Sequence, residues 1–322
     1  MTISPFDTAI RHVRAASSGE HSQSGQPSAT PNLLIPLAKP SKAGAGLDFI
    51  THFFTNKATI QLTLMHIPPS QAAVWVEETN FESVDLLDMR IKTADRQGKA
   101  IVEHAGRKLR AAGFPAENIK EKVAPPQMSK AKDIIREASK GLYDAVVLGR
   151  RVHEGLAEIM DQSVCRELLE GLSHAISFPL WLCRLPEPGR TNVLLCVDGS
   201  DPSDRMADHV GFMLSHDPGH TVTVLNVHDP AKSNPLDAES IVNHAVEVMV
   251  EAGMPMDRII QRIIRGTNPA RLIREEYLGG KYAAVALGSA GADRGFWNKL
   301  FVGSVARTLF KDLRGAALWV CF

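Results

Sequence analysis

The chain has 322 residues, and its 36 basic and 36 acidic side chains give a formal net charge of zero. This balance, together with a 44% apolar fraction and no apolar run near the ~20 residues of a membrane span, favours a globular protein without a nucleic-acid or membrane partner. The N-terminus lacks the apolar region of a secretion signal, so we expect a cytoplasmic protein whose four cysteines are reduced thiols.

Residues 1–30 are rich in Ser, Gly, Gln and His, which predicts a flexible tail. From residue 31 onward the sequence contains two related repeats. Asn32-Leu33-Leu34-Ile35-Pro36 returns as Asn192-Val193-Leu194-Leu195-Cys196, and Leu180-Trp181-Leu182-Cys183 returns as Leu318-Trp319-Val320-Cys321. Repeats of this length indicate a duplicated domain, because each copy is long enough to bury its own core. We predict domains at 31–185 and 191–322, joined by a proline- and glycine-containing linker at 186–190.

The second repeat alternates short apolar runs with helix-like stretches. Uninterrupted apolar runs are typical of strands that are buried on both faces of a parallel sheet. Alternating strands and helices predict an α/β fold with right-handed crossovers. The expected strands are 192–197, 221–227, 259–264, 283–287 and 317–321, and the expected helices are 203–215, 237–252, 269–279 and 303–313.

The first repeat follows the same order but carries about 20 additional residues before Gly113. The offset between matched blocks is 160 residues at Asn32 and Asn192, and it falls to 140 at Gly113 and Gly253. The insertion includes residues 74–90, which we expect to form a longer helix or a flap.

Candidate ligand-binding residues follow two strands of the second repeat. In parallel α/β sheets, ligands bind beyond the carboxyl ends of strands, where the strand order reverses. Asp198 follows the first strand, where an aspartate can accept from an adenine amino group or a ribose hydroxyl, and Gly288-Ser289-Ala290-Gly291 follows the fourth. Glycines let backbone N–H groups approach a ligand, and the helix that opens at Gly303-Ser304-Val305 adds a positive dipole end suited to phosphate. The alternatives are an Asx turn or helix cap at Asp198, and a tight loop without a ligand at 288–304.

Three segments of the second repeat, Val197-Asp198-Gly199-Ser200, the Gly-x-x-Gly…Gly-Ser loop and the closing Trp319-Val320-Cys321, resemble the universal stress protein family. The resemblance extends over residues 31–322. It implies two tandem doubly wound domains, each a five-stranded parallel sheet of order 3-2-1-4-5 flanked by helices. It also implies that ATP or AMP, with or without Mg²⁺, binds in the second domain. The residues implied to contact the nucleotide are Val197, Asp198, Val227, Leu287, Gly288, Ser289, Gly291, Gly303, Ser304 and Val305.

Both loops depart from the pattern of the family's ATP-binding branch, which places nine residues between the second and third glycines. Eleven residues separate Gly291 from Gly303 in the second repeat. In the first repeat, Ala38 stands in the place of Asp198 and Val152 in the place of Gly291, although nine residues still separate Val152 from Gln162. A β-branched side chain disfavours the positive φ that glycine allows. We therefore predict that the first domain does not bind ATP in the usual way.

These features predict a stress-response protein that binds an adenine nucleotide in its C-terminal domain and acts as a regulatory or sensor module. The sequence shows no evident general base, nucleophile or metal cluster, so we expect no enzymatic activity beyond slow, incidental ATP hydrolysis. The alternative is a dimerisation or interaction scaffold that binds no nucleotide. Because family members pair the edges of their sheets, we expect the final strands, 179–183 and 317–322, to pair within the chain. A homodimer is left open.

Overall fold

The computed structural model describes residues 30–38, 44–69, 84–141, 143–149, 164, 167–168, 176–184, 187–231, 235–289 and 304–322. Residues 31–322 form one compact unit. The predicted tail at residues 1–30 lies outside the described residues except for its last one.

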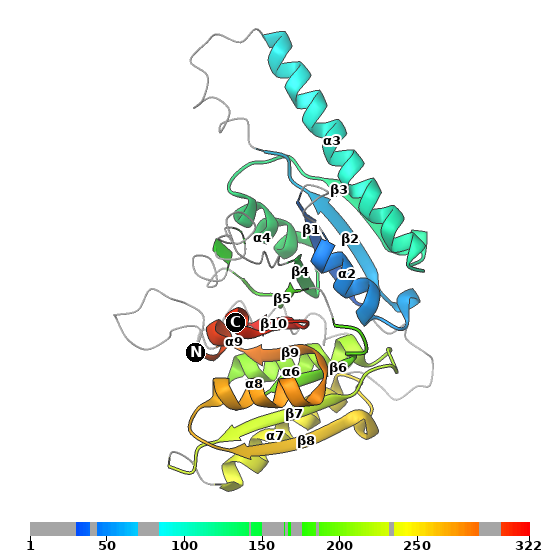
Figure 1. Cartoon of the computed structure of the whole chain (residues 1–322). Helices are drawn as coiled ribbons and strands as arrows, with labels where there is room; N and C mark the ends of the chain where they lie inside the picture. The colour runs from blue at the N-terminus through cyan, green and yellow to red at the C-terminus, as the bar shows by residue number, and fades with distance from the viewer. Residues whose placement is uncertain are drawn as a thin grey trace, which may run out of the picture. The chain divides into compact units, whose positions relative to one another are not determined.

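Both repeats fold into alternating strands and helices, as the apolar runs predict (Figure 1). The first repeat comprises β1 (Asn32–Leu37), α2 (Gly44–Phe53), β2 (Gln61–His66), α3 (Val84–Ala111), β3 (Ile119–Val123), α4 (Lys130–Gly141), β4 (Ala145–Gly149) and β5 (Leu180–Cys183). The second comprises β6 (Asn192–Cys196), α6 (Asp201–Leu214), β7 (Val222–His228), α7 (Pro235–Glu251), β8 (Ile259–Arg265), α8 (Pro269–Gly280), β9 (Tyr282–Gly288), α9 (Ser304–Asp312) and β10 (Ala317–Cys321). Short 3-10 turns lie at Lys57–Thr59, Ala116–Asn118 and Met256–Arg258.

The strands form one ten-stranded sheet of order β3-β2-β1-β4-β5-β10-β9-β6-β7-β8. Within each repeat the strand pairs are parallel, and the order is 3-2-1-4-5 counted along that repeat. The expected fold class is therefore confirmed. The domain boundaries at 185 and 191 stay predictions, because both repeats belong to one compact unit.

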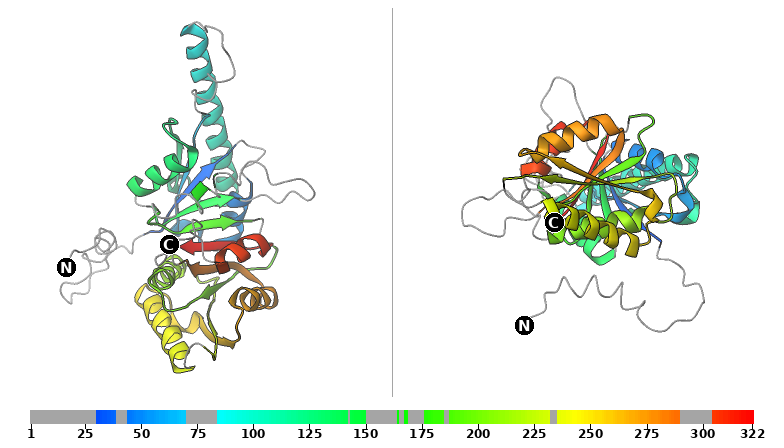
Figure 2. Two further views of the ribbon diagram at one scale, coloured as in Figure 1. Left: turned by 90° about the vertical axis from the view of Figure 1, so that its left-hand side faces the viewer. Right: turned by 90° about the horizontal axis from the view of Figure 1, so that it is seen from below.

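Helices cover both faces of the sheet (Figure 2). One apolar cluster joins the strands to buried side chains of α2, α3, α6 and α7, and a second cluster joins them to α4, α8 and α9. Strands buried on both faces explain the uninterrupted apolar runs in the sequence. In β4 and β9, for example, Val146 and Val285 have no exposed surface.

The extra residues of the first repeat contribute to a 28-residue helix, α3. The C-terminal part of α3 packs on the sheet through Ile101, Val102 and Leu109, all buried. The helix starts at Val84, inside the segment expected to form a helix or flap, and residues 74–83 of that segment lie outside the described residues.

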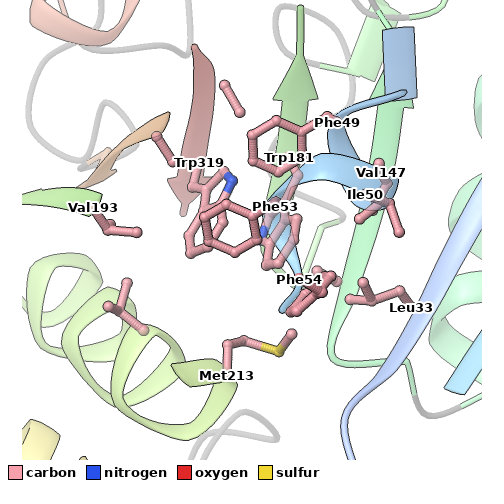
Figure 3. Packing of buried hydrophobic residues seen from close by; sticks show 14 of the residues in the cluster. Leu33, Phe49, Ile50, Phe53, Phe54, Val147, Trp181, Val193, Met213 and Trp319 are labelled. Carbon is pink, nitrogen blue, oxygen red and sulfur yellow. The ribbon is translucent and has the colours of Figure 1, made fainter. Parts of the chain in front are cut away.

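The two repeats meet where β5 pairs antiparallel with β10, with Trp181 opposite Trp319. The indole rings of these tryptophans stack at 3.8 Å between centroids, and neither has exposed surface (Figure 3). Phe53 packs edge-on against both rings. The two apolar edge strands that the sequence predicts to pair therefore do pair, as β5 and β10. The stacked and edge-on aromatic rings add directional contacts to the buried apolar area.

The aromatic stack is not symmetric between the repeats. Trp181 Nε1 donates a hydrogen bond of 3.0 Å to His209 Nε2, while Trp319 Nε1 is buried with no acceptor among the described residues. The position equivalent to His209 in the first repeat is Phe49, at the offset of 160 residues. A phenyl ring has no nitrogen lone pair to accept from an indole N–H.

A polar contact also links the repeats. The buried Asp217 carboxylate accepts from the Thr55 backbone N–H at 2.8 Å and from the Thr55 hydroxyl, and His220 Nε2 lies 3.3 Å from it. Burial raises the pKa of Asp217, but the nearby His220 ring and the hydrogen bonds from Thr55 outweigh burial and hold the pKa below its usual range. At the equivalent position the first repeat has Lys57, so this contact occurs in one copy only.

Candidate functional site

The candidate site lies at the carboxyl ends of β6 and β9, which run parallel and pair Cys196 with Leu287. Beyond these ends the chain leaves β6 toward α6 and leaves β9 toward the residues before α9. Successive strands of the repeat lie on opposite sides of this junction, with β7 next to β6 and β10 next to β9. This is the place where an open parallel sheet forms a crevice for a ligand.

Asp198 stands at this junction with its side chain exposed. Its Oδ1 atom accepts hydrogen bonds from the Ser200 N–H at 3.1 Å and from the Ser200 hydroxyl at 2.6 Å. These contacts form the Asx turn that the sequence left as an alternative. Gly199 between them has φ of +77°, a conformation that favours glycine.

Gly288 has a steric role at the end of β9. A Cβ atom at Gly288 would lie 2.3 Å from the Ser203 backbone nitrogen, at the start of α6. The first repeat repeats this close approach, since a Cβ at Gly149 would lie 2.9 Å from the Gly46 nitrogen in α2. The glycine shared by both repeats therefore lets a helix begin against the neighbouring strand end.

Ser289 continues the pairing of β9 with β10. Its backbone N–H donates to the Cys321 carbonyl at 2.7 Å, and only 2% of the residue is exposed. Leu287, Val227 and Val305 belong to the apolar cluster beneath this end of the sheet, and Val197 is buried in the opposite cluster. The structure thus brings six predicted residues and the start of α9 to one end of the second repeat.

The predicted Gly291 and Gly303 lie outside the described residues, as do Val152, Gln162 and Ser163 of the first repeat. Ser304 is the first residue of α9. The structure therefore describes the adenine end of the implied site and leaves most of the loop at the implied phosphate end undescribed.

The sequence prediction missed Asn226. Its side-chain amide is buried and donates a hydrogen bond of 2.8 Å to the Val197 carbonyl, at the point where β6 ends. His66 is the matching residue of the first repeat, and its Nδ1 lies 2.9 Å from the Leu37 carbonyl. A polar residue at offset 160 in both repeats, within an apolar strand, was the signal that marked this pair.

The histidine and the asparagine differ in one property. Burial lowers the pKa of His66, while its hydrogen bond to Leu37 raises it and the charge of Lys130 lowers it further. Asn226 does not titrate, so the strand end in the second repeat is held in the same way at every pH.

Cys196 ends β6 and Cys321 ends β10, close to the candidate site. Burial raises the pKa of the Cys321 thiol to about 12 and that of Cys196 further above its usual value, which leaves both thiols protonated and unreactive. Across the described ranges, no group of three or more His, Cys, Asp or Glu side chains is arranged to hold a metal ion. None of the described helices is long and apolar enough to cross a membrane.

Comparisons with known proteins agree with the geometry. Residues 189–314 match the model of the universal stress protein family. A universal stress protein from Archaeoglobus fulgidus DSM 4304 is 16% identical, covers 91% of this chain and 98% of its own, and superposes with a TM-score of 0.63. No curated protein matches the chain.

Two further solved structures are less alike. A putative universal stress protein from Pseudomonas aeruginosa UCBPP-PA14 is 14% identical over 91% of this chain and 94% of its own, with a TM-score of 0.46. A universal stress protein in complex with cAMP is 20% identical over 40% of this chain and 94% of its own, with a TM-score of 0.33. At these identities the likeness concerns the fold alone.

Proposed function

Since residues 189–314 are a universal stress protein domain, we propose that the protein binds one adenine nucleotide per chain, at the carboxyl ends of β6 and β9, and acts as a regulatory module in a stress response. The observation that carries the proposal is the exposed carboxylate of Asp198 at the junction of these strands. The first repeat has the same strand ends but presents Ala38 there.

The backbone of β7 supports an adenine contact next to Asp198. The Val197 N–H donates to the Leu225 carbonyl at 2.9 Å, so the peptide groups of Leu225 face β6. Because peptide groups alternate in direction along a strand, those of Val227 face the same way, just beyond the end of β6. Adenine carries an amino donor beside a ring-nitrogen acceptor, which complements a backbone C=O and N–H.

The proposed roles follow from these positions. The Val227 backbone would pair with the edge of the base, Val197 and Leu287 would pack beside the base, and Asp198 would accept from a ribose hydroxyl. The N-terminus of α9 at Ser304 would face the phosphates, with Gly291 and Gly303 letting the loop approach them. ATP, with Mg²⁺ held by its own phosphates, and AMP are the two candidate ligands.

We propose binding without turnover. The Ser200 hydroxyl donates a hydrogen bond to the Asp198 carboxylate, as a nucleophile would to a general base. Catalysis by such a pair would also need a third group that orients the base. Regulation would then follow from occupancy of the site, because a ligand that binds only the folded state stabilises it by mass action.

Two variants of Asp198 test the site. Asp198→Asn removes the charge but keeps an oxygen that can accept from Ser200, whereas Asp198→Ala copies the first repeat and removes both. Hydrogen bonds to a charged group contribute about 1.5–3 kcal/mol, so Asp198→Ala should weaken nucleotide binding by roughly 10- to 100-fold in calorimetric titrations.

Asp198→Asn distinguishes a ligand role from a purely local one. If the carboxylate binds the ribose, Asp198→Asn weakens binding nearly as much as Asp198→Ala. Ala38→Asp, at the matching position of the first repeat, serves as the control and should leave the affinity unchanged. Equal affinity for wild type and both Asp198 variants would remove Asp198 from the site.

A second candidate function is a scaffold that binds no nucleotide. The Asx turn at Asp198 and the steric role of Gly288 favour it, because both explain these residues without a ligand. Thermal unfolding with millimolar ATP or AMP separates the two functions. A ligand at ~100 times its Kd adds about 2.7 kcal/mol of stability, while a scaffold shows no shift in melting temperature.

A further inference from the structure

The two outer strands of the ten-stranded sheet are β3 and β8, which are matched strands of the two repeats. β3 carries Lys120, Glu121 and Lys122, and two prolines follow it at 125 and 126. Charged side chains and prolines protect a sheet edge from pairing with another strand. Two of the charges are also engaged, because Glu121 lies 3.0 Å from Arg110 and Lys122 lies 2.6 Å from Glu137.

The β8 edge has less of this protection, although Arg262 keeps the charge of Lys122. At the offset of 140 residues, Ile260 replaces Lys120 and Gln261 replaces Glu121, and β8 continues for seven residues without proline. Ile260 is 52% exposed and Ile263 is 39% exposed, on opposite faces of the strand. An exposed strand of β-branched residues at a sheet edge is a site for pairing with a further strand.

The backbone of β8 shows which residues would make that pairing. The Gly266 N–H donates to the His228 carbonyl of β7 at 2.9 Å. Because the direction of the peptide groups alternates along a strand, the N–H and C=O groups of residues 260, 262 and 264 also face β7. Those of Gln261 and Ile263 face outward, away from the sheet.

We infer that the β8 edge binds the β8 edge of a second copy of this chain, antiparallel, with Gln261 on the two-fold axis. A two-fold axis normal to the sheet maps each face of the sheet onto the same face of the second copy. Opposite residues of an antiparallel pair point to the same face, and side chains alternate along a strand, so opposite residues must both have odd numbers or both have even numbers. Centring the register on Gln261 satisfies this and makes Gln261 and its copy a hydrogen-bonded pair. Ile259 then lies opposite Ile263 of the second copy, where β-branched side chains pack well.

The charges at the ends of this register are complementary. Asp257 lies in the 3-10 turn just before β8, so it would stand near Arg265 at the end of the paired strand of the second copy, and the symmetry creates the same contact twice. Both side chains are exposed, so they are accessible to a partner. Moving the centre to Arg262 would instead place Arg262 opposite itself, which is unfavourable. The strand therefore matches a second copy of itself better in one register than in the next.

The first test weakens the edge. Ile260→Lys gives β8 the lysine of β3 and places it opposite Arg262 of the second copy. Analytical ultracentrifugation of the full chain should show a reversible dimer whose Kd rises about tenfold or more in this variant. Ile91→Lys is the matched control, because Ile91 of α3 is also exposed (46%) and the substitution is the same. Far-UV circular dichroism checks that both variants fold.

The second test reads the register. Opposite residues of a hydrogen-bonded antiparallel pair have Cα atoms ~5.5 Å apart, within the range that a disulfide spans. Gln261→Cys should therefore form an intermolecular disulfide under mild oxidation. Ile260→Cys should not, because residue 260 and its copy are offset by two positions along the strands, which places their Cα atoms roughly 8 Å apart.

A third test exchanges the end charges. Arg265→Asp alone brings two like charges, Asp257 and the new carboxylate, near each other at each end of the paired strands, and should weaken the dimer by about three- to tenfold. Adding Asp257→Arg to the same chain should restore dimerisation. A monomer at all concentrations, a dimer insensitive to Ile260→Lys, or efficient cross-linking at residue 260 instead of 261 would each overturn the inference. Pairing with the chain's own N-terminal segment or with another protein would appear as a monomer and so as one of these failures.

Discussion

Replacing His209 by Phe should remove a pH-dependent part of the protein's stability. His209 is buried between the repeats and accepts from Trp181 Nε1. Burial lowers the pKa of His209 to about 3, well below its usual value of 6.5. The unfolded chain therefore binds a proton at a pH where the folded chain does not. The stability that neutral His209 supports is fully present above about pH 6.5 and is lost progressively as pH falls toward 3.

The size of the effect follows from these two pKa values. Between pH 7.5 and pH 5.0 the unfolded histidine becomes almost fully charged while the folded one stays neutral, which costs the wild type about 2 kcal/mol at ~1.4 kcal/mol per pH unit below 6.5. His209→Phe copies Phe49 of the first repeat. It leaves the buried Trp181 N–H without an acceptor, at a cost of about 1–3 kcal/mol, but it removes the titrating group.

Urea unfolding followed by far-UV circular dichroism measures both terms. The variant should be less stable than wild type at pH 7.5, and the difference should shrink by about 2 kcal/mol at pH 5.0. Other groups titrate equally in both proteins and cancel in the difference. A difference that stays constant within about 0.5 kcal/mol across this range would refute the assignment of a neutral, buried His209.

Two further predictions concern the junction of the repeats and the close approach at the site. Asp217→Asn should destabilise the protein by roughly 2–4 kcal/mol at pH 7 in urea melts, because the buried side chain loses charge-assisted hydrogen bonds from Thr55 and its contact with His220. Since the folded pKa of Asp217 is lowered, this loss of stability should diminish as pH falls through the carboxylate range. A loss that does not depend on pH would contradict this role. Gly288→Ala should destabilise by about 1–3 kcal/mol because its Cβ would meet the start of α6, whereas Gly279→Ala, with nothing within 4 Å, should be neutral or stabilising; similar melting temperatures for both variants would contradict the steric role.

Much of the fold could be predicted because the two repeats confirm each other. Apolar runs such as Asn192–Cys196 and Tyr282–Gly288 marked the strands, and their alternation with helices gave a parallel sheet. The family resemblance supplied the strand order. The length of α3 could not be predicted, because no matching segment in the second repeat serves as a guide.

The site was harder to predict than the fold. A sequence shows which residues follow a strand but not where their side chains turn. Asp198 was expected at the strand end and stands there, yet its carboxylate also closes an Asx turn with Ser200. Gly288 was assigned to a ligand, and the structure adds a close helix approach that requires it equally. Asn226 was missed because a polar residue in a mainly apolar strand reads as a packing exception until its partner, the Val197 carbonyl, is seen.

The asymmetry between the repeats was predicted from residues and extends beyond them. Ala38 in the place of Asp198 marked the first repeat as lacking the site's acid. The structure adds three matched positions that differ: Phe49 stands in the place of His209, Lys57 in the place of Asp217, and the charged β3 in the place of the isoleucine-rich β8. The first two differences give the second repeat polar contacts that the first lacks, Trp181 with His209 and Thr55 with Asp217.

We propose that only the second repeat binds an adenine nucleotide. Isothermal titration calorimetry of the full chain with ATP and with AMP, each with and without Mg²⁺, tests it most directly through the stoichiometry. We predict one site per chain, which is lost or strongly weakened in Asp198→Ala and unchanged in Ala38→Asp. Two equivalent sites per chain, or no binding of either nucleotide to the folded protein, would contradict the claim.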